Sequence, residues 1–100
     1  MSNPVLDYGW KPVNVTDDAI VFAGKCVLHT IVVNGLTTAG DAAIYDGVDA
    51  TGTLIGTQHL DPTTSISVQP ITFTYDCEMA DGIFIDYDGT LAADLTVMYH

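Results

Sequence analysis

The stretch ITFTYDCEM, residues 71–79, alternates apolar and polar residues with a period of two. In an extended strand such alternation sends one set of side chains into a core and the other into solvent. The apolar face would carry Ile71, Phe73, Tyr75 and Cys77, and the polar face Thr72, Thr74, Asp76 and Glu78. This stretch therefore predicts a strand that is half-buried in a β-sheet.

Two further stretches repeat the pattern, and a third departs from it. GIFIDYDG (82–89) aligns Ile83, Ile85 and Tyr87, and DLTVMYH (94–100) aligns Leu95, Val97 and Tyr99. CVLHTIVVNG (26–35) carries apolar residues on both expected faces. Strict alternation places Val27, Ile31 and Val33 on one face and Leu28 and Val32 on the other. This pattern is typical of a strand covered on both faces, or of one lying between the core and a partner subunit.

The rest of the chain indicates the same fold class. Val, Ile and Thr dominate, and turn residues recur about every ten positions. The further expected strands are 13–16, 19–23, 42–45, 54–60 and 65–69, the last counted with the run after Pro70. No ten-residue segment has a helical period. We expect an all-β chain, a single antiparallel β-sandwich of about eight short strands with a jelly-roll-like arrangement.

Residues 1–12 differ from the rest and are expected to form an N-terminal arm, with the sandwich domain spanning 13–100. Pro4 and Pro12 disfavour a central strand. Four apolar or aromatic residues stand among the polar ones and are candidates for an interface: Val5, Leu6, Tyr8 and Trp10. The arm either folds over its own sandwich or packs as an aromatic anchor on another subunit.

The charge balance excludes several kinds of partner. Lys11 and Lys25 are the only fixed cations in a chain with a net charge of −11. Such a chain cannot neutralise phosphates, so neither nucleic acid nor an anionic membrane is expected as a partner. No apolar run approaches the roughly 20 residues of a membrane span, and the first residues lack a signal-peptide pattern. We expect a soluble protein made in the cytoplasm.

The tripeptide Tyr-Asp-Gly occurs at 45–47 and again at 87–89. Asp86 and Asp88 are candidates for a metal site, because two carboxylates that are two residues apart lie on the same side of a strand. The spacing of an EF-hand is missing, and the only glutamate is Glu78. Asp-Gly is also the dipeptide of tight turns that need a positive φ. We therefore expect both tripeptides to turn the chain, with glycine supplying the φ and aspartate satisfying the backbone.

The sequence predicts no enzyme, no cofactor and no metal. None of the serines, which include Ser65 and Ser67, stands in a nucleophile elbow. The histidines (His29, His59 and His100) are expected to be structural or solvent-facing. Cys26 and Cys77 lie in apolar β-like runs, outside any C-x-x-C motif. They are expected to be buried thiols, with a disulfide or a reactive thiol as the alternative.

Four segments in order resemble small β-sandwich virion proteins of tailed bacteriophages. They are GKCVLHTIVVN (24–34), AIYDGVDATGTLIGT (43–57), TFTYDCEMADGIFIDYDG (72–89) and DLTVMYH (94–100). The resemblance implies a capsid decoration, or cement, protein on the outside of the capsid that clamps major capsid protein subunits together. It carries over no catalytic residue, and the two cysteines and the extreme acidity depart from the family pattern.

The resemblance leaves the position in the virion open. It also fits a head-fibre or tail module, so the alternative function is a receptor- or carbohydrate-binding sandwich, with or without the assistance of calcium. For the decoration protein, the expected partners are the major capsid protein and further copies of the chain in a homotrimer or homodimer.

Overall fold

The computed structural model describes residues 10–63 and 70–100. Val5, Leu6 and Tyr8 of the expected arm, and the strand expected at 65–69, lie outside the described residues. Within these ranges the chain forms eight strands and no helix. The strands are β1 (Lys11–Val15), β2 (Ala19–Ala23), β3 (Cys26–Thr38), β4 (Gly40–Asp46), β5 (Thr53–Leu60), β6 (Ile71–Met79), β7 (Gly82–Tyr87) and β8 (Ala92–Tyr99). No helix long and apolar enough to cross a membrane occurs in this part of the chain.

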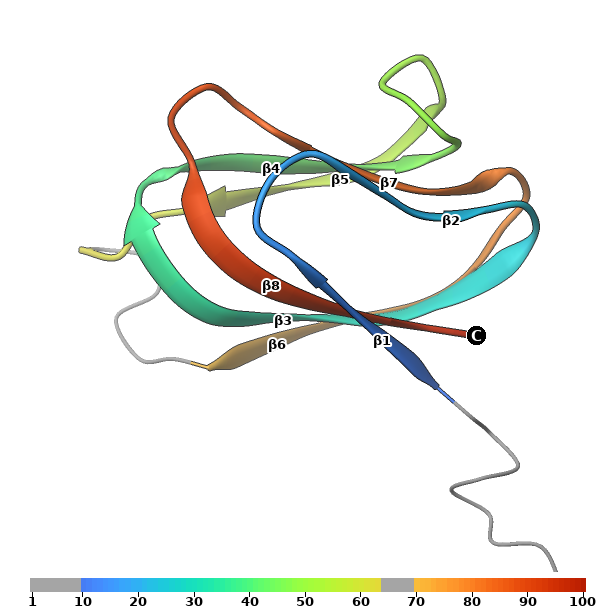
Figure 1. The fold of residues 1–100 in the computed structure, drawn as a ribbon, viewed down its shortest axis with the longest axis horizontal. Coiled ribbons are helices and arrows are strands. Elements are labelled where there is room, and N and C mark those ends of the chain that lie inside the picture. The colour runs from blue at the N-terminus through green and yellow to red at the C-terminus, as the bar shows by residue number, and fades with distance from the viewer. Residues whose placement is uncertain (1–9, 64–69) are drawn as a thin grey trace, which may run out of the picture.

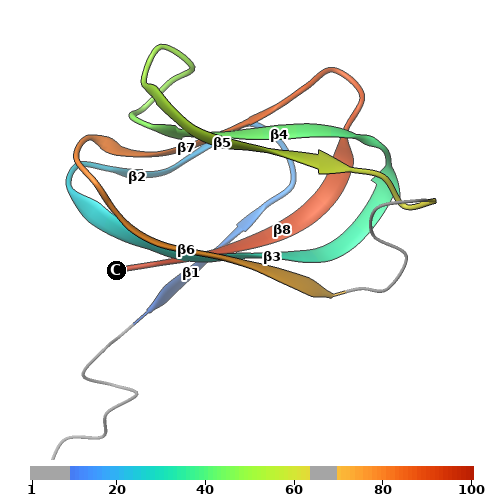
Figure 2. The same ribbon diagram turned by 180° about the vertical axis from the view of Figure 1, so that it is seen from behind.

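The strands form two antiparallel sheets that face each other, as Figures 1 and 2 show from opposite sides. Sheet A has the order β1-β8-β3-β6, and sheet B has the order β2-β7-β4-β5. First pairs with last, second with seventh, third with sixth and fourth with fifth. This nested pairing is what results when an eight-stranded antiparallel ribbon is rolled into two layers. The expected jelly-roll-like sandwich is therefore confirmed.

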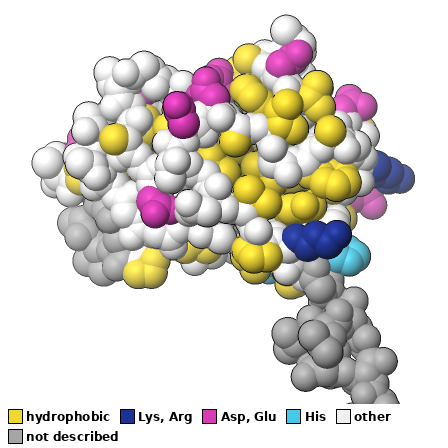
Figure 3. All heavy atoms as spheres, viewed as in Figure 1, with side chains coloured by type: hydrophobic (Ala, Val, Ile, Leu, Met, Phe, Trp, Pro, Cys, Tyr) yellow, Lys and Arg dark blue, Asp and Glu magenta, His cyan; other side chains and the backbone are white. Residues whose placement is uncertain are grey.

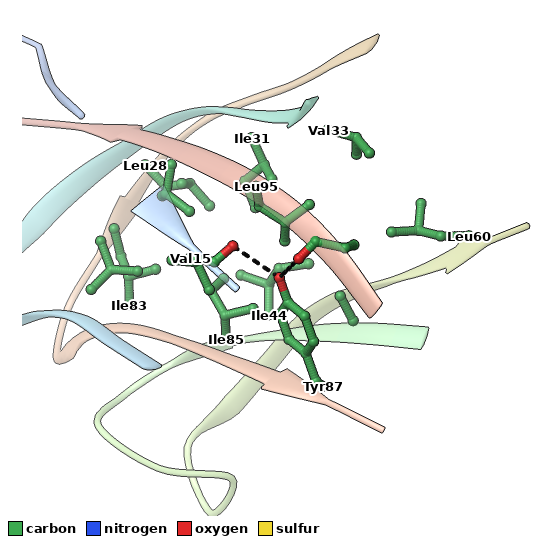
Figure 4. Close-up of a cluster of buried hydrophobic side chains, with 14 of the residues drawn as sticks. Val15, Leu28, Ile31, Val33, Ile44, Leu60, Ile83, Ile85, Tyr87 and Leu95 are labelled. Atoms are coloured by element: carbon green, nitrogen blue, oxygen red, sulfur yellow. Dashed lines mark hydrogen bonds between the residues drawn. The ribbon is translucent and has the colours of Figure 1, made fainter. Parts of the chain in front are cut away.

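The core lies between the two sheets and is built from the side chains that point inward at alternate positions along the strands (Figure 4). The largest side chains that are fully buried are Leu28, Ile31, Ile44, Met79, Ile83, Ile85 and Leu95. The alternation predicted for 71–79, 82–87 and 94–99 is confirmed, because inward residues alternate with more exposed ones in β6, β7 and β8. In β7, for example, Ile83, Ile85 and Tyr87 all face inward. Burial of these side chains is the main force that holds the sheets together.

The faces predicted for β3 are partly wrong because the strand contains a bulge. Leu28 pairs with Tyr99 of β8, but Thr30 pairs with Met98, so His29 is an extra residue in β3. An extra residue reverses the side to which the following side chains point. Leu28 and Ile31 are consequently both buried in the core. The apolar residues of β3 fall on two faces of a strictly alternating strand because the inward positions shift by one residue at the bulge.

Strand β1 begins earlier than expected. Lys11 pairs with Tyr99 and Pro12 with Met98 at the edge of sheet A, so residues 11 and 12 belong to the sandwich. Trp10 precedes the strand and stacks on His29, with ring centroids 4.2 Å apart and planes 12° from parallel. The chain is thus fixed to sheet A from Trp10 onward.

Candidate functional site

The two Tyr-Asp-Gly tripeptides both lie at turns. Residues 45–47 lead from β4 into the β4–β5 hairpin, and residues 87–89 lead from β7 of sheet B to β8 of sheet A. The expected role of glycine is wrong, because neither Gly47 nor Gly89 has a positive φ. Positive φ values occur instead at Gly24, at Gly82 and, outside the glycines, at Asp76. A positive φ at glycine therefore explains neither turn.

Asp46 fixes a turn that is distant in sequence. Its carboxylate accepts hydrogen bonds from the backbone N–H groups of Ala80, Asp81 and Gly82, at 2.9, 2.8 and 3.3 Å. These donors form the corner between β6 and β7, so Asp46 ties the end of β4 to the passage from sheet A to sheet B. Hydrogen bonds from Asp81 and Ala80 lower the pKa of this carboxyl group.

Asp88 is committed to the backbone in the same way. Its carboxylate accepts from the N–H groups of Asp41, Thr90 and Leu91, at 2.8, 3.0 and 2.8 Å. Backbone hydrogen bonds, that of Thr90 first, lower its pKa to about 2. Asp86 lies on the outer face of β7, two residues earlier. Among residues 10–63 and 70–100, no three His, Cys, Asp or Glu side chains are grouped to hold a metal ion.

A short motif explains several of the other aspartates. In each of Asp49-Ala50-Thr51, Asp61-Pro62-Thr63 and Asp88-Gly89-Thr90, the Asp carboxylate accepts from both the N–H and the hydroxyl of the threonine two residues on. This bonding mimics a backbone turn. The pattern Asp-x-Thr is visible in the sequence, but it is not sufficient for a turn, because Asp94-Leu95-Thr96 also has it and lies within β8.

The histidines contact carboxylates or aromatic rings. His29 Nδ1 bonds the carboxylate of Asp76, and His59 Nδ1 lies 2.9 Å from Asp41 Oδ1. The His100 ring meets the edge of Trp10 at a centroid distance of 5.8 Å. Ser65 and Ser67 lie outside the described residues.

Both cysteines are free thiols, as expected, although Cys77 is only half-buried. Burial, first of all, raises the pKa of each thiol. A raised pKa leaves little thiolate at neutral pH, and the thiolate is the reactive form.

A continuous apolar row crosses the outer face of sheet B. Ile20 of β2 pairs with Phe84 of β7, Phe84 with Tyr45 of β4, and Tyr45 with Leu54 of β5. Residues directly opposite each other in a sheet share a face, so these four side chains stand side by side. Three strand spacings make the row about 14 Å long. We call Ile20, Phe84, Tyr45 and Leu54 the apolar row.

The apolar row is exposed. Ile20 retains 55% and Leu54 52% of their accessible surface, while Tyr45 and Phe84 are half-buried against each other. Ile55, the extra residue beside Leu54, and Val48 in the adjoining hairpin loop are exposed as well. Figure 3 looks onto the edge of the sandwich that carries β1 and β2, and it shows that hydrophobic side chains also gather there, over the region of β2. An exposed apolar strip is typical of a surface that another molecule covers.

Carboxylates follow the apolar row along the same face. Asp86 lies two residues beyond Phe84, and it pairs with Ala43, which is two residues before Tyr45. Asp41 lies a further two residues along β4 and faces His59 across the hairpin. The outer face of sheet B is thus apolar at one end and acidic at the other.

The outer face of sheet A is mostly polar. Thr72, Thr74, Thr96 and Asn14 face outward there, and Asn34 donates to Thr96 Oγ1 at 2.8 Å and to Asp94. Among the described residues of this face, Trp10 is the one large apolar residue that is exposed, with 37% of its surface accessible. Of the four interface candidates in the sequence, Trp10 alone lies among the described residues, and it lies on this face.

Sequence reasoning missed the apolar row because no single strand contains two of its members. The pairing of four strands brings them together, and that pairing cannot be read from the alternation of one strand.

The comparison of the chain with protein-family models, with curated proteins and with solved structures found no match.

Proposed function

We propose that this protein is a non-enzymatic structural component of a bacteriophage virion. In this role it decorates the outside of the capsid and stabilises it by binding across major capsid protein subunits. It would be made in the host cytoplasm and would join the virion as a homotrimer or homodimer. The proposal takes its virion context from the sequence resemblance and its mode of action from the surface of the sandwich.

The apolar row is the observation that carries the proposal. A monomer in water gains nothing from leaving Ile20 and Leu54 about half exposed on a sheet face. The apolar area that a partner covers there contributes about 25 cal/mol for each Å² removed from water, before the cost of association. A rigid strip across four paired strands can bridge two neighbouring subunits without a conformational change.

The charge supports an exterior position. A net charge of −11 would oppose packaged DNA on the inside of a capsid. Many of the carboxylates hold turns on the surface of the sandwich, as Asp46 and Asp88 do, so the acidity is part of how this chain folds. A protein of this charge is best placed where solvent and a less acidic partner surround it.

The test uses heads of the phage that encodes the chain, prepared without this protein. The purified protein should sediment with the heads and raise the temperature at which they release DNA. Heads that neither retain the protein nor gain heat resistance would contradict the proposal. Bovine serum albumin at the same concentration controls for non-specific protection.

One observation favours the alternative, a receptor- or carbohydrate-binding module. The partly exposed ring of Trp10 lies on the polar face of sheet A, and aromatic rings with neighbouring polar groups are common in ligand sites. Trp10 is the only tryptophan, so its fluorescence reports on that face. Saturable quenching by host-surface oligosaccharides would favour this function, and melting with calcium and then with chelator would show whether an ion takes part.

A further inference from the structure

We propose that the outer face of sheet B is the docking face of this protein, and that it takes a protein surface with an apolar centre flanked by lysine or arginine. The inference deepens the proposed function and rests on it for the identity of the partner. The face itself is argued from the apolar row and from the charges that lie beside it.

The first step is the shape of the apolar row. Its four members come from four strands that are hydrogen-bonded to one another, so their spacing is fixed by the sheet. Tyr45 and Phe84 lie at the centre with ring centroids 6.3 Å apart, and the aliphatic Ile20 and Leu54 lie at the two ends. Aromatic residues at the centre of a preformed surface are typical of binding hot spots.

The second step is the charge beside the row. Asp86 lies about 7 Å along β7 from Phe84, on the same face. Asp41 lies further along β4, close to His59. These carboxylates oppose phosphate groups, so neither nucleic acid nor an anionic lipid surface fits this face. They attract cationic side chains, which would steer a basic partner onto the row.

The third step excludes a second copy of the chain as the occupant. Two such faces brought together would place Asp41 and Asp86 of both copies in one interface. The only lysines lie elsewhere, Lys11 in β1 of sheet A and Lys25 in the corner between β2 and β3. A self-pairing through sheet B would therefore bring like charges together without compensation. Self-association is expected through the side of the molecule that carries Trp10.

The first experiment needs no phage component. The full-length protein, labelled with ¹⁵N, is titrated with a short peptide of alternating leucine and arginine, and amide shifts are mapped onto the strands. We expect shifts at the apolar row and at Asp86, and we expect them to weaken as NaCl rises from about 50 to about 500 mM. Shifts centred on the threonine-rich face of sheet A, or on no face, would overturn the inference.

The second experiment measures affinity for heads with paired variants. Leu54→Ser and Asp86→Asn alter the docking face, and Val32→Ser and Glu78→Gln make the same kinds of change on the outer face of sheet A. We expect Leu54→Ser to weaken binding by about tenfold and Asp86→Asn by about threefold, with both controls near wild type. Melting temperatures of all four variants verify that each is folded.

The outcomes separate the two proposals. Wild-type protein that binds heads, with losses only in the sheet A variants, would overturn the docking face and leave the proposed function standing. If wild-type protein does not bind heads, while the peptide still shifts the amides of the apolar row, the proposed function would be overturned and the docking face supported. An oligomer in analytical ultracentrifugation that Leu54→Ser dissociates would show that sheet B binds a second copy, and would overturn the inference.

Discussion

The two tyrosines of the repeated tripeptide have opposite roles. Tyr87 points into the core, where its hydroxyl donates to the carbonyl of Ala93 at 2.8 Å and lies 3.1 Å from that of Val15 (Figure 4). Burial, followed by the charges of Asp94, Asp17 and Asp18, raises the pKa of Tyr87 well above its usual range. Tyr45 points outward into the apolar row. The difference follows from one residue of register, which decides whether a side chain faces the core.

Replacing Tyr87 with phenylalanine should lower stability because the buried carbonyl of Ala93 loses its donor and that of Val15 loses a polar neighbour. We expect Tyr87→Phe to reduce the free energy of unfolding by about 1–2 kcal/mol, as measured in urea. Tyr45→Phe removes the same hydroxyl from the outer face and should change stability by less than about 0.5 kcal/mol. Equal losses in the two variants would contradict the assigned role of the Tyr87 hydroxyl.

Acid should destabilise the fold through Asp88. Its pKa is about 2 in the folded chain and 3.8 without the fold, so the folded state favours the carboxylate. The stability that it contributes is present above about pH 4 and is lost as the pH falls toward 2. Urea midpoints at about pH 7, 4, 3 and 2 should fall across the last three. In Asp88→Asn the fall should be shallower, and an identical pH dependence would show that other groups cause it.

At the scale of the elements, the sequence predicts the strands better than it predicts their faces. Alternation in 71–79 and 82–87 is regular, and both strands have the predicted sides. In β3 the extra residue His29 is set by the pairing with β8, and a local pattern cannot reveal it. The apolar row likewise depends on the pairing of four strands. The information that was missing in both cases is cross-strand register, which long-range packing determines.

Close packing at the turn between β3 and β4 gives a test at this scale. A Cβ on Gly40 would lie 2.5 Å from Asp88 Oδ1 and 2.6 Å from the backbone nitrogen of Leu91. The corner between β7 and β8 would have to move, so Gly40→Ala should cost about 1–3 kcal/mol of stability.

Gly35→Ala is the matched control, because nothing lies within 4 Å of a Cβ placed on Gly35. It should be neutral or stabilising by up to about 1 kcal/mol, since alanine restricts the unfolded chain. Thermal melts of the two variants make the comparison. A Gly40→Ala protein as stable as Gly35→Ala would mean that the corner yields without cost.

At the scale of the whole molecule, the two sheets have different outer surfaces. Sheet B presents the apolar row and its carboxylates, while sheet A presents threonines, asparagines and the ring of Trp10. The rolled ribbon also places β1 and β2 on the same side of the sandwich, where Phe22 of sheet B contacts Tyr99 of sheet A at a centroid distance of 5.3 Å. Trp10 and β1 belong to sheet A, and the proposed docking face belongs to sheet B.

Removing residues 1–9 should therefore leave the sandwich folded and its docking face intact. The cut precedes Trp10 and β1, so it preserves the stacking on His29 and the pairing with β8. The truncated chain should keep the circular dichroism of a β-protein and bind the leucine–arginine peptide as the full chain does. Its self-association in analytical ultracentrifugation should weaken, because Val5, Leu6 and Tyr8 have the composition of an anchor for another subunit.

A cut after residue 12 serves as the contrast. It removes Trp10 and two residues that pair with β8, and it exposes the edge of sheet A. That variant should melt several degrees lower than the chain cut after residue 9, because the β8 edge loses partners for its backbone groups. If the cut after residue 9 already unfolds the protein, the first nine residues contribute to the core and the anchor is wrongly assigned. If the cut after residue 9 leaves the oligomer unchanged, self-association depends either on Trp10 or on the strands alone. Analytical ultracentrifugation of Trp10→Ala then distinguishes these two possibilities.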